Sequence, residues 1–237
     1  MSIKENILNI KEFLHNFAFR DLRVIVAAFI FISASWAFIE IADEVNEGST
    51  KAFDETILTT LRNAENYEIP RGPKWLPEAV RDITALGGGM VLFLLTASVA
   101  GFLILQKEYK IMWLMLITVA GGALLSYGLK EFYARERPDV VLHLMAETSL
   151  SFPSGHSMMS IVVYLALGSL IARLQTRRRI RVYIITLALF LSFLIGLSRI
   201  YLGVHYPTDV LAGWSVGLAW ASLVWFAAWY IQRKYDK

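Results

Sequence analysis

The 237-residue sequence contains no cysteine. This absence excludes disulfide cross-links and catalysis by a thiolate. It also excludes a zinc site that is built from sulfur ligands. A chain without cysteine is compatible with an oxidising exterior but does not require one.

Charge is scarce over long stretches: hydrophobic residues make up 56% of the chain and charged residues only 18%. A helix needs about 17–25 apolar residues to cross a bilayer, and six runs reach or approach that length. The runs cover residues 24–42, 86–105, 111–129, 157–172, 182–197 and 210–231. A soluble core is excluded because the remaining polar surface is too small to cover these runs. We therefore expect an all-α membrane protein in which six transmembrane helices form one bundle.

Lysine and arginine are concentrated in alternate connections between these runs. They occur in the amino-terminal segment, in the turn with Lys107 and Lys110, in the link 173–181 and in the tail 233–237. The positive-inside tendency predicts that these segments, and both termini, are cytoplasmic. Segments 43–85, 130–156 and 198–209 then lie outside. Membrane topology explains the basic clusters, so we expect no nucleic-acid partner.

Two segments outside the main apolar runs show helical periodicity. Residues 1–20 alternate apolar side chains and lysines at helical spacing, which predicts an amphipathic helix on the inner membrane surface or against the cytoplasmic ends of the bundle. Residues 21–237 then form a single six-span domain. In the outer segment 43–85, helices are expected at 50–64 and 75–86. These short helices could form a lid, a rim for lipid entry or a structural cap.

Three short motifs with polar side chains lie in or beside the outer segments. They are Lys130 with Arg137-Pro138, then Pro153-Ser154-Gly155-His156, then Ser198-Arg199 with His205 and Asp209. Together they provide three cations, two histidines and a single carboxylate. No carboxylate cluster that could hold a divalent metal accompanies them. This combination suits the binding, attack and release of a phosphoryl group without a metal or other cofactor.

The first motif supplies cations. Lys130 and Arg137 are seven residues apart, which would place them on one face of a helix that leaves the third run. Arginine can grip phosphate oxygens with two donors, whereas lysine acts as a point charge. Arg135 lies off that face, and no site role is expected for it. Taken alone, such cations at a membrane edge commonly extend into the interface without further function.

The other two motifs supply a helix start and an imidazole pair. Ser154 and Gly155 would begin the fourth helix, where free N–H groups favour an anion, and His156 could transfer a proton near neutral pH. His205 and Asp209 are four residues apart. Asp209 could hold one imidazole nitrogen and leave the other free to attack. The alternatives are a plain helix cap at Ser154 and a carboxylate that merely favours a helix N-terminus.

The ordered set of motifs resembles the three-part signature of the type 2 phosphatidic acid phosphatase family. That family includes bacterial lipid phosphatases and glucose-6-phosphatase, and vanadium haloperoxidases share its site. The resemblance covers residues 80–231 and implies an all-helical bundle with the site at its outer end. It implies that His205 is the nucleophile, that Asp209 assists it and that His156 is the general acid. The phosphate ligands implied by the resemblance are Lys130, Arg137, Ser154, Gly155 and Arg199.

We therefore expect metal-independent hydrolysis of a lipid phosphate or pyrophosphate at the outer face of a bacterial-type cytoplasmic membrane, through a phosphohistidine. Undecaprenyl pyrophosphate, phosphatidic acid, phosphatidylglycerophosphate and a lipid A phosphate all remain open as substrates, and so does the oligomeric state. One alternative is a phosphotransferase that uses a second lipid as acceptor. Another is a binder or transporter of phosphorylated lipid, although binding alone does not need an oriented imidazole.

Overall fold

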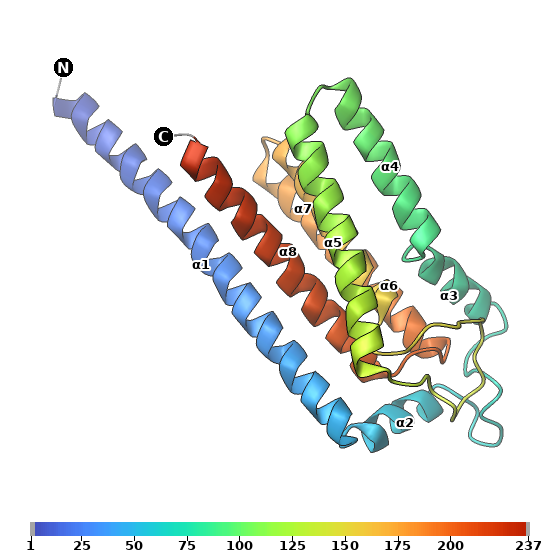
Figure 1. Ribbon diagram of the computed structural model, residues 1–237. Helices are drawn as coiled ribbons and strands as arrows, with labels where there is room; N and C mark the ends of the chain where they lie inside the picture. The colour runs from blue at the N-terminus through green and yellow to red at the C-terminus, as the bar shows by residue number, and fades with distance from the viewer. Residues whose placement is uncertain (1–2, 236–237) are drawn as a thin grey trace.

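The computed structural model describes residues 3–235, which form eight helices joined by irregular connections (Figure 1). The helices are α1 (Ile3–Glu47), α2 (Lys51–Thr60), α3 (Leu76–Ala85), α4 (Gly89–Leu105), α5 (Tyr109–Tyr133), α6 (Gly155–Arg173), α7 (Arg178–Tyr201) and α8 (Pro207–Tyr235). Within this part of the chain, the one β-type pairing is an isolated bridge between Arg62 and Pro70. The predicted all-α fold is confirmed.

Five helices are long and apolar enough to cross a membrane: Val24–Glu47 within α1, then α5, α6, α7 and Pro207–Ile231 within α8. A sixth span results if α3 and α4 are taken together, since they meet at a bend of 41°. Helix α4 has 17 residues, which is only about 25 Å at 1.5 Å per residue. The expected run 86–105 therefore needs α3 to complete its crossing.

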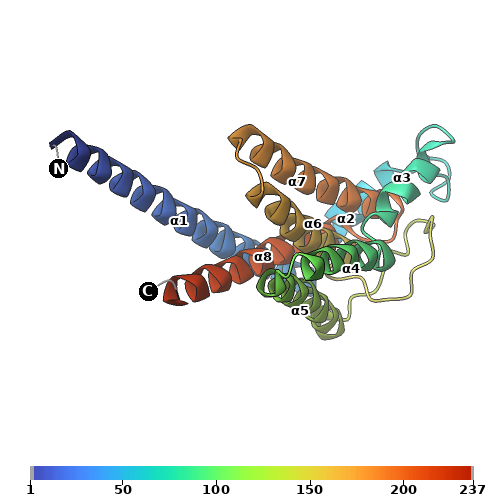
Figure 2. The ribbon, with the colours of Figure 1, turned by 90° about the horizontal axis from the view of Figure 1, so that it is seen from above.

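Helix α6 is the central element of the bundle. It packs against α5, α7 and α8, while α1 lies along α8 at the side (Figures 1 and 2). Half of the apolar window of α6 is buried inside the protein, compared with 6% of the window in α1. Large apolar side chains such as Phe29 and Leu124 remain exposed on the outer helices, as is expected of a surface that faces lipid.

The amino-terminal segment continues directly into the first span. Residues 3–20 are helical, and α1 has no break before Glu47. The described side chains begin at Leu22. The prediction of an amphipathic face on residues 1–20 therefore lies outside the described side chains.

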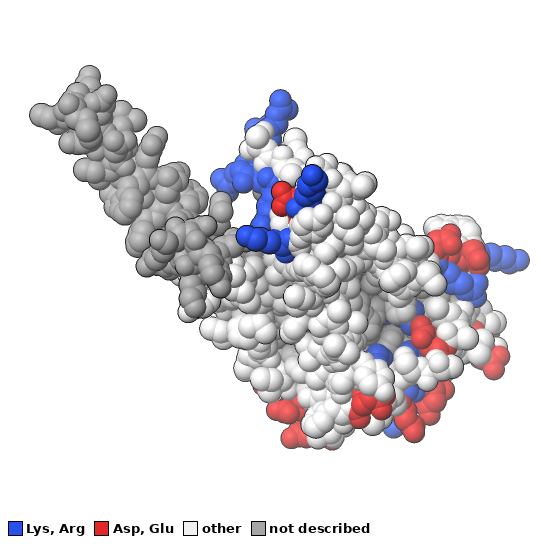
Figure 3. All heavy atoms as spheres, turned by 45° about the horizontal axis from the view of Figure 1, so that its top comes forward, with Lys and Arg blue, Asp and Glu red and all other residues white. Residues whose placement is uncertain are grey.

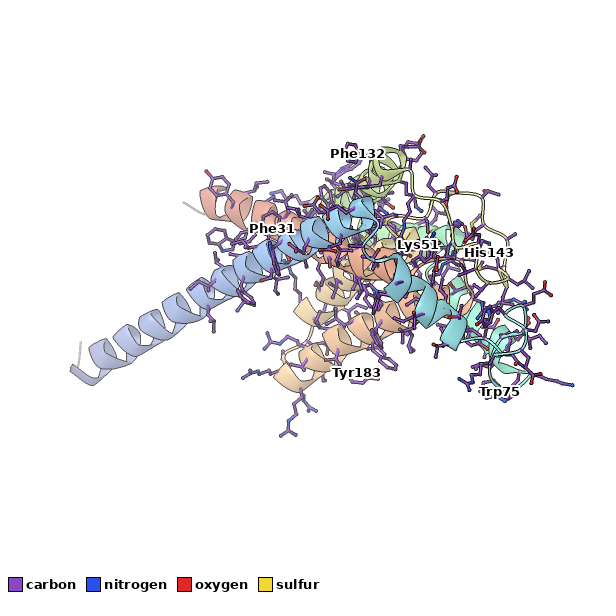
Figure 4. The ribbon with its side chains drawn as sticks, turned by 90° about the horizontal axis from the view of Figure 1, so that it is seen from below. Phe31, Lys51, Trp75, Phe132, His143 and Tyr183 are labelled. Atoms are coloured by element: carbon purple, nitrogen blue, oxygen red, sulfur yellow. The ribbon has the colours of Figure 1, made fainter. Side chains whose placement is uncertain are left out.

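The long connections gather at one end of the bundle. Figure 4 looks onto this end, where α2, α3, segment 134–154 and the turn before α8 lie together and where Trp75 and His143 sit at the edge. Phe152 is fully buried here, and its ring lies 5.0 Å from that of Tyr133 and 6.1 Å from that of Phe38. These aromatic contacts fix the end of segment 134–154 against α1 and α5. We call this end the loop end.

The two ends of the bundle differ in charge. In Figure 3 the end away from α2 carries mainly lysine and arginine, whereas the loop end carries most of the acidic residues together with some basic ones. The exposed arginines of the α6–α7 link are Arg173, Arg177, Arg178, Arg179 and Arg181. The basic α6–α7 link, which the sequence predicts to be cytoplasmic, therefore lies at the end of the bundle opposite the loop end.

Candidate active site

The three motifs come together at the centre of the loop end. Lys130 lies in the last turn of α5, Arg199 in the last turn of α7, and Ser154 caps α6. Helix α8 approaches the start of α6 closely, because a Cβ at Gly213 would lie only 2.6 Å from the Ser154 carbonyl oxygen. The Ser154 N–H donates to the Asp209 carbonyl oxygen at 2.9 Å. These contacts join the second motif to the third.

His205 is 1% exposed and lies in the turn between α7 and α8. Its Nδ1 is 3.3 Å from Oδ2 of the fully buried Asp209. That carboxylate oxygen also accepts the Tyr206 N–H at 2.9 Å and the Ser151 hydroxyl. With Nδ1 directed at a carboxylate, Nε2 is the nitrogen that points to the cations, 3.3 Å from Nη1 of Arg137. The arrangement fixes the orientation of the imidazole, with Nδ1 toward Asp209 and Nε2 toward Arg137.

The surroundings of His205 keep its imidazole neutral. Burial, followed by the charges of Arg199 and Arg137, lowers the pKa of His205 well below 6.5. A positive ring would lose hydration and would face like charges. A neutral ring with its proton on Nδ1 keeps a lone pair on Nε2, on the side of the Arg137 guanidinium.

Arg137 is held by segment 134–154 and by the turn before His205. Its Nε donates to the Ser149 carbonyl oxygen at 2.6 Å, Nη2 donates to the Ser149 hydroxyl at 3.0 Å, and Nη1 donates to the Val204 carbonyl oxygen at 2.5 Å. Burial lowers the pKa of Arg137, but a guanidinium remains charged at any physiological pH. A rigid cation thus stands beside Nε2 of His205.

The prediction that Lys130 and Arg137 share a helix face is wrong. Helix α5 ends at Tyr133, and Ala134 adopts the left-handed conformation with φ 45°. This ends the helical repeat before Arg137. The two residues still converge, because segment 134–154 folds back over the end of α5, where Lys130 Nζ donates to the Leu150 carbonyl oxygen.

Arg199 is fully buried and forms an ion pair with Glu147 through Nη2, while Nη1 lies 3.2 Å from the Thr84 hydroxyl. Its Nε is buried without a hydrogen-bond partner among residues 3–235. Glu147 Oε2 is also 3.6 Å from Nη2 of Arg137. Burial alone would raise the pKa of Glu147, but Arg199 and Arg137 outweigh it and lower the pKa. An ionised carboxylate therefore lies between two of the three cations that are expected to bind phosphate.

The start of α6 contributes backbone donors and His156. Ser154 Oγ accepts the Ser157 N–H at 3.4 Å and the Ser157 hydroxyl at 2.9 Å, so its own proton can still be donated. Gly155 and His156 occupy the first turn, where N–H groups have no acceptor within the helix. The His156 ring packs against the α3–α4 link, since a Cβ at Gly87 would lie 3.4 Å from its Cδ2.

Four residues that sequence reasoning left out also belong to this region: Asp54, Arg135, Glu147 and Ser151. No site role was expected for Arg135, because it lies off the predicted helix face of Lys130 and Arg137. In the structure its Nη1 donates to Asp209 Oδ1 at 2.6 Å. Arg135 and Asp54 are 81 residues apart in sequence. Periodicity cannot find such a pair, because it compares residues only within one helix.

Comparison with known proteins agrees with the motifs. The PAP2 superfamily matches residues 111–233, which include all eight expected site residues. Phosphatidylglycerophosphatase B of Bacillus subtilis is 36% identical over 185 residues, which are 76% of this chain and 86% of that protein. Lipid A 1-phosphatase of Rhizobium etli is 30% identical over 186 residues, which are 67% of this chain and 75% of that protein.

Two solved structures share the fold. A transmembrane PAP2-type phosphatidylglycerolphosphate phosphatase from Bacillus subtilis aligns with a TM-score of 0.77 and 31% identity over 86% of this chain and 98% of that one. Aquifex aeolicus LpxE aligns with a TM-score of 0.56 and 26% identity over 73% of this chain and 94% of that one. Together with the profile match, which covers more than half of the 237 residues, these similarities show that the chain belongs to the PAP2 superfamily.

Proposed function

We propose that this protein is a metal-independent phosphatase that hydrolyses a lipid phosphate through a phosphohistidine on His205. The observation that carries the proposal is the environment of His205: a buried neutral imidazole, held by Asp209 through Nδ1, with Nε2 beside the Arg137 guanidinium. A site that only binds phosphate needs the cations but has no use for an oriented neutral imidazole.

Phosphate binding is assigned to Lys130, Arg137, Arg199, Ser154 and the first turn of α6 at Gly155. The Nε of Arg199 is a buried donor without a partner in the described part of the chain, and a phosphate oxygen would satisfy it. The N–H groups that begin α6 and the helix dipole favour an anion at the same place. These donors would stabilise the three equatorial oxygens as charge spreads over them in the transition state.

In the first chemical step, His205 Nε2 attacks phosphorus and the bond from phosphorus to the lipid oxygen breaks. His156 donates a proton to that oxygen, so the lipid leaves as an alcohol. Asp209 stabilises the positive charge that develops on the His205 ring. The product of this step is a phosphohistidine and a neutral His156.

In the second step, a water molecule attacks the phosphorus of the phosphohistidine. His156 accepts a proton from the water, and the bond from phosphorus to Nε2 breaks. Inorganic phosphate leaves, and both histidines return to their starting protonation states. The cations supply the charge stabilisation in both steps, so the proposal contains no step that needs a metal.

The substrate is proposed to be a membrane lipid, presented at the outer face of the membrane. The site lies at the loop end of a bundle with five or six spans, and the exposed arginines of the α6–α7 link lie at the other end (Figure 1). By the positive-inside tendency, the loop end is then extracytoplasmic. The names of similar proteins include a phosphatidylglycerophosphatase, a lipid A 1-phosphatase and an undecaprenyl-diphosphatase, which supports a lipid phosphate or pyrophosphate.

The test is phosphate release by the purified full-length protein in EDTA. The panel contains phosphatidylglycerophosphate, phosphatidic acid, undecaprenyl pyrophosphate and a lipid A 1-phosphate. We expect turnover of at least one lipid in EDTA, inhibition by vanadate, and no turnover by His205→Ala. Activity that EDTA abolishes and magnesium restores would refute the metal-independent mechanism.

A further inference from the structure

Asp209 is anchored on the side that faces away from His205. Its Oδ2 faces the His205 ring, whereas its Oδ1 accepts from Nη1 of Arg135 at 2.6 Å. A carboxylate is planar and rigid, so fixing Oδ1 also fixes the direction in which Oδ2 points. Arg135 therefore helps to set the orientation of the imidazole, together with the Tyr206 N–H and the Ser151 hydroxyl that donate to Oδ2.

Arg135 is itself held on two further sides. Its Nη2 donates to Asp54 Oδ2 at 2.8 Å, and its guanidinium stacks over the Tyr206 ring at 4.2 Å from the ring centroid. Burial alone would lower the pKa of Arg135, but the charges of Asp209 and Asp54 outweigh it and raise the pKa. The guanidinium is thus a fixed cation shared by two buried carboxylates.

Asp54 connects this cation to the start of α8. It is fully buried on α2, which contacts α8 at the loop end (Figure 1). Its Oδ1 accepts the Thr208 N–H at 3.1 Å, and its Oδ2 accepts the Thr208 hydroxyl at 2.6 Å. The first N–H groups of a helix have no intrahelical acceptor, so α2 provides a cap for α8 in the turn that carries Asp209.

Three of the five N–H donors of Arg135 are engaged in these contacts. Nη1 donates to Asp209 and to the Thr208 hydroxyl at 2.9 Å, and Nη2 donates to Asp54. The cations Arg137 and Arg199 instead share Glu147, the anion that lies among the expected phosphate ligands. Arg135 therefore faces the carboxylates behind His205 and not the phosphate.

We propose that Arg135, held by Asp54 of α2, is a positioning residue that fixes Asp209 and through it the nucleophilic imidazole of His205. The inference rests on the proposed function, because it assumes that His205 attacks phosphorus. It assigns α2, outside the three motifs, a part in catalysis. The carboxylates of Asp54 and Asp209 are both buried and share the guanidinium of Arg135 as their counter-charge. Loss of Arg135 would therefore leave both carboxylates without this cation.

The test compares Arg135→Gln, Asp54→Asn and the double variant with the wild-type protein. Two quantities are measured on the full-length protein in detergent: the burst rate of His205 phosphorylation by nitrophenyl phosphate, and the inhibition constant of inorganic phosphate. We expect Arg135→Gln to slow the burst about 10²-fold, the size of effect known for misplaced reacting groups. The constant of inorganic phosphate should stay at the wild-type value, because this ligand is held by the cations and not by the His205 ring. Asp54→Asn keeps an oxygen for the Thr208 N–H and removes the ion pair with Arg135, so it should slow the burst less, and the double variant should be no slower than Arg135→Gln.

Arg135→Lys and Glu55→Gln complete the set. Lysine can pair with Asp209 but cannot bridge to Asp54, so we expect Arg135→Lys to recover part of the burst rate. If Arg135→Gln does not fold, Arg135→Lys and Asp54→Asn provide the test. Glu55 follows Asp54 on α2 and pairs with the exposed Lys51 at 3.7 Å, so Glu55→Gln should match the wild type. A weaker affinity for inorganic phosphate that parallels the slower burst would make Arg135 a phosphate ligand, and an unchanged burst would remove it from catalysis. Either result would overturn the positioning role alone. A wild-type protein without phosphohistidine would instead refute the proposed function.

Discussion

Arg199, which is fully buried at the end of α7, forms an ion pair with Glu147 of the segment between α5 and α6. The same carboxylate lies 3.6 Å from Nη2 of Arg137. Two of the cations assigned to the phosphate thus share an anion that the protein itself supplies. A phosphate that binds to these guanidiniums has to compete with Glu147 or displace it.

The first prediction follows from this competition. Glu147→Gln removes the competing charge, and a hydrogen bond to a charged group contributes about 1.5–3 kcal/mol. We expect the inhibition constants of inorganic phosphate and vanadate to fall about tenfold, which corresponds to about 1.4 kcal/mol. Glu78→Gln is the control, since Glu78 pairs with Arg81 at an exposed position on α3. Weaker inhibition of Glu147→Gln would mean that Glu147 serves to hold the arginines in place.

The second prediction concerns pH. Burial and the positive charges of Arg199 and Arg137 lower the pKa of His205, and attack requires the neutral ring. Loss of a neighbouring cation makes the charged ring less unfavourable, so its pKa rises. Arg137→Gln should therefore move the acid limb of the kcat/KM profile to higher pH, in addition to lowering activity. Arg81→Gln serves as the control and should leave the acid limb unchanged. If the acid limb also stays in place in Arg137→Gln, it does not report the titration of His205.

The third prediction separates the two histidines by leaving group. Protonation by a general acid contributes about 10²–10⁴-fold, and it matters for a lipid alkoxide but little for nitrophenolate. In the His156→Ala variant, the burst of His205 phosphorylation should stay fast with nitrophenyl phosphate and become slow with the lipid phosphate substrate. The burst is the measurement of choice because the later hydrolysis also uses His156. Equal slowing with both substrates would make His156 a phosphate ligand and not an acid.

The fourth prediction concerns sidedness. The native chain has no cysteine, so a single introduced thiol can be labelled without background. Glu65 at the loop end and Arg179 in the α6–α7 link are both exposed. In intact cells, an impermeant thiol reagent should label Glu65→Cys and should label Arg179→Cys only after the membrane is opened. The opposite pattern would place the site on the cytoplasmic side and exclude substrates of the outer leaflet.

The sequence alone determined the helices and the residues that carry the chemistry. Long apolar runs between basic clusters have few stable alternatives to spanning helices, because the backbone in lipid must satisfy its own hydrogen bonds. The contact between His205 and Asp209 could also be expected, because both residues lie within one turn of a helix start. Local spacing sets these features.

The tertiary structure alone decided how the motifs meet. The helical extrapolation from Lys130 to Arg137 failed at Ala134, where the backbone turns left-handed and segment 134–154 folds back. The position of this segment depends on the packing of Phe152 against α1 and α5, and no local repeat encodes that packing. The pairing of Arg135 with Asp54, 81 residues away, likewise arises only when α2 docks on the start of α8. Buried charges need partners, but the fold determines which partners are within reach.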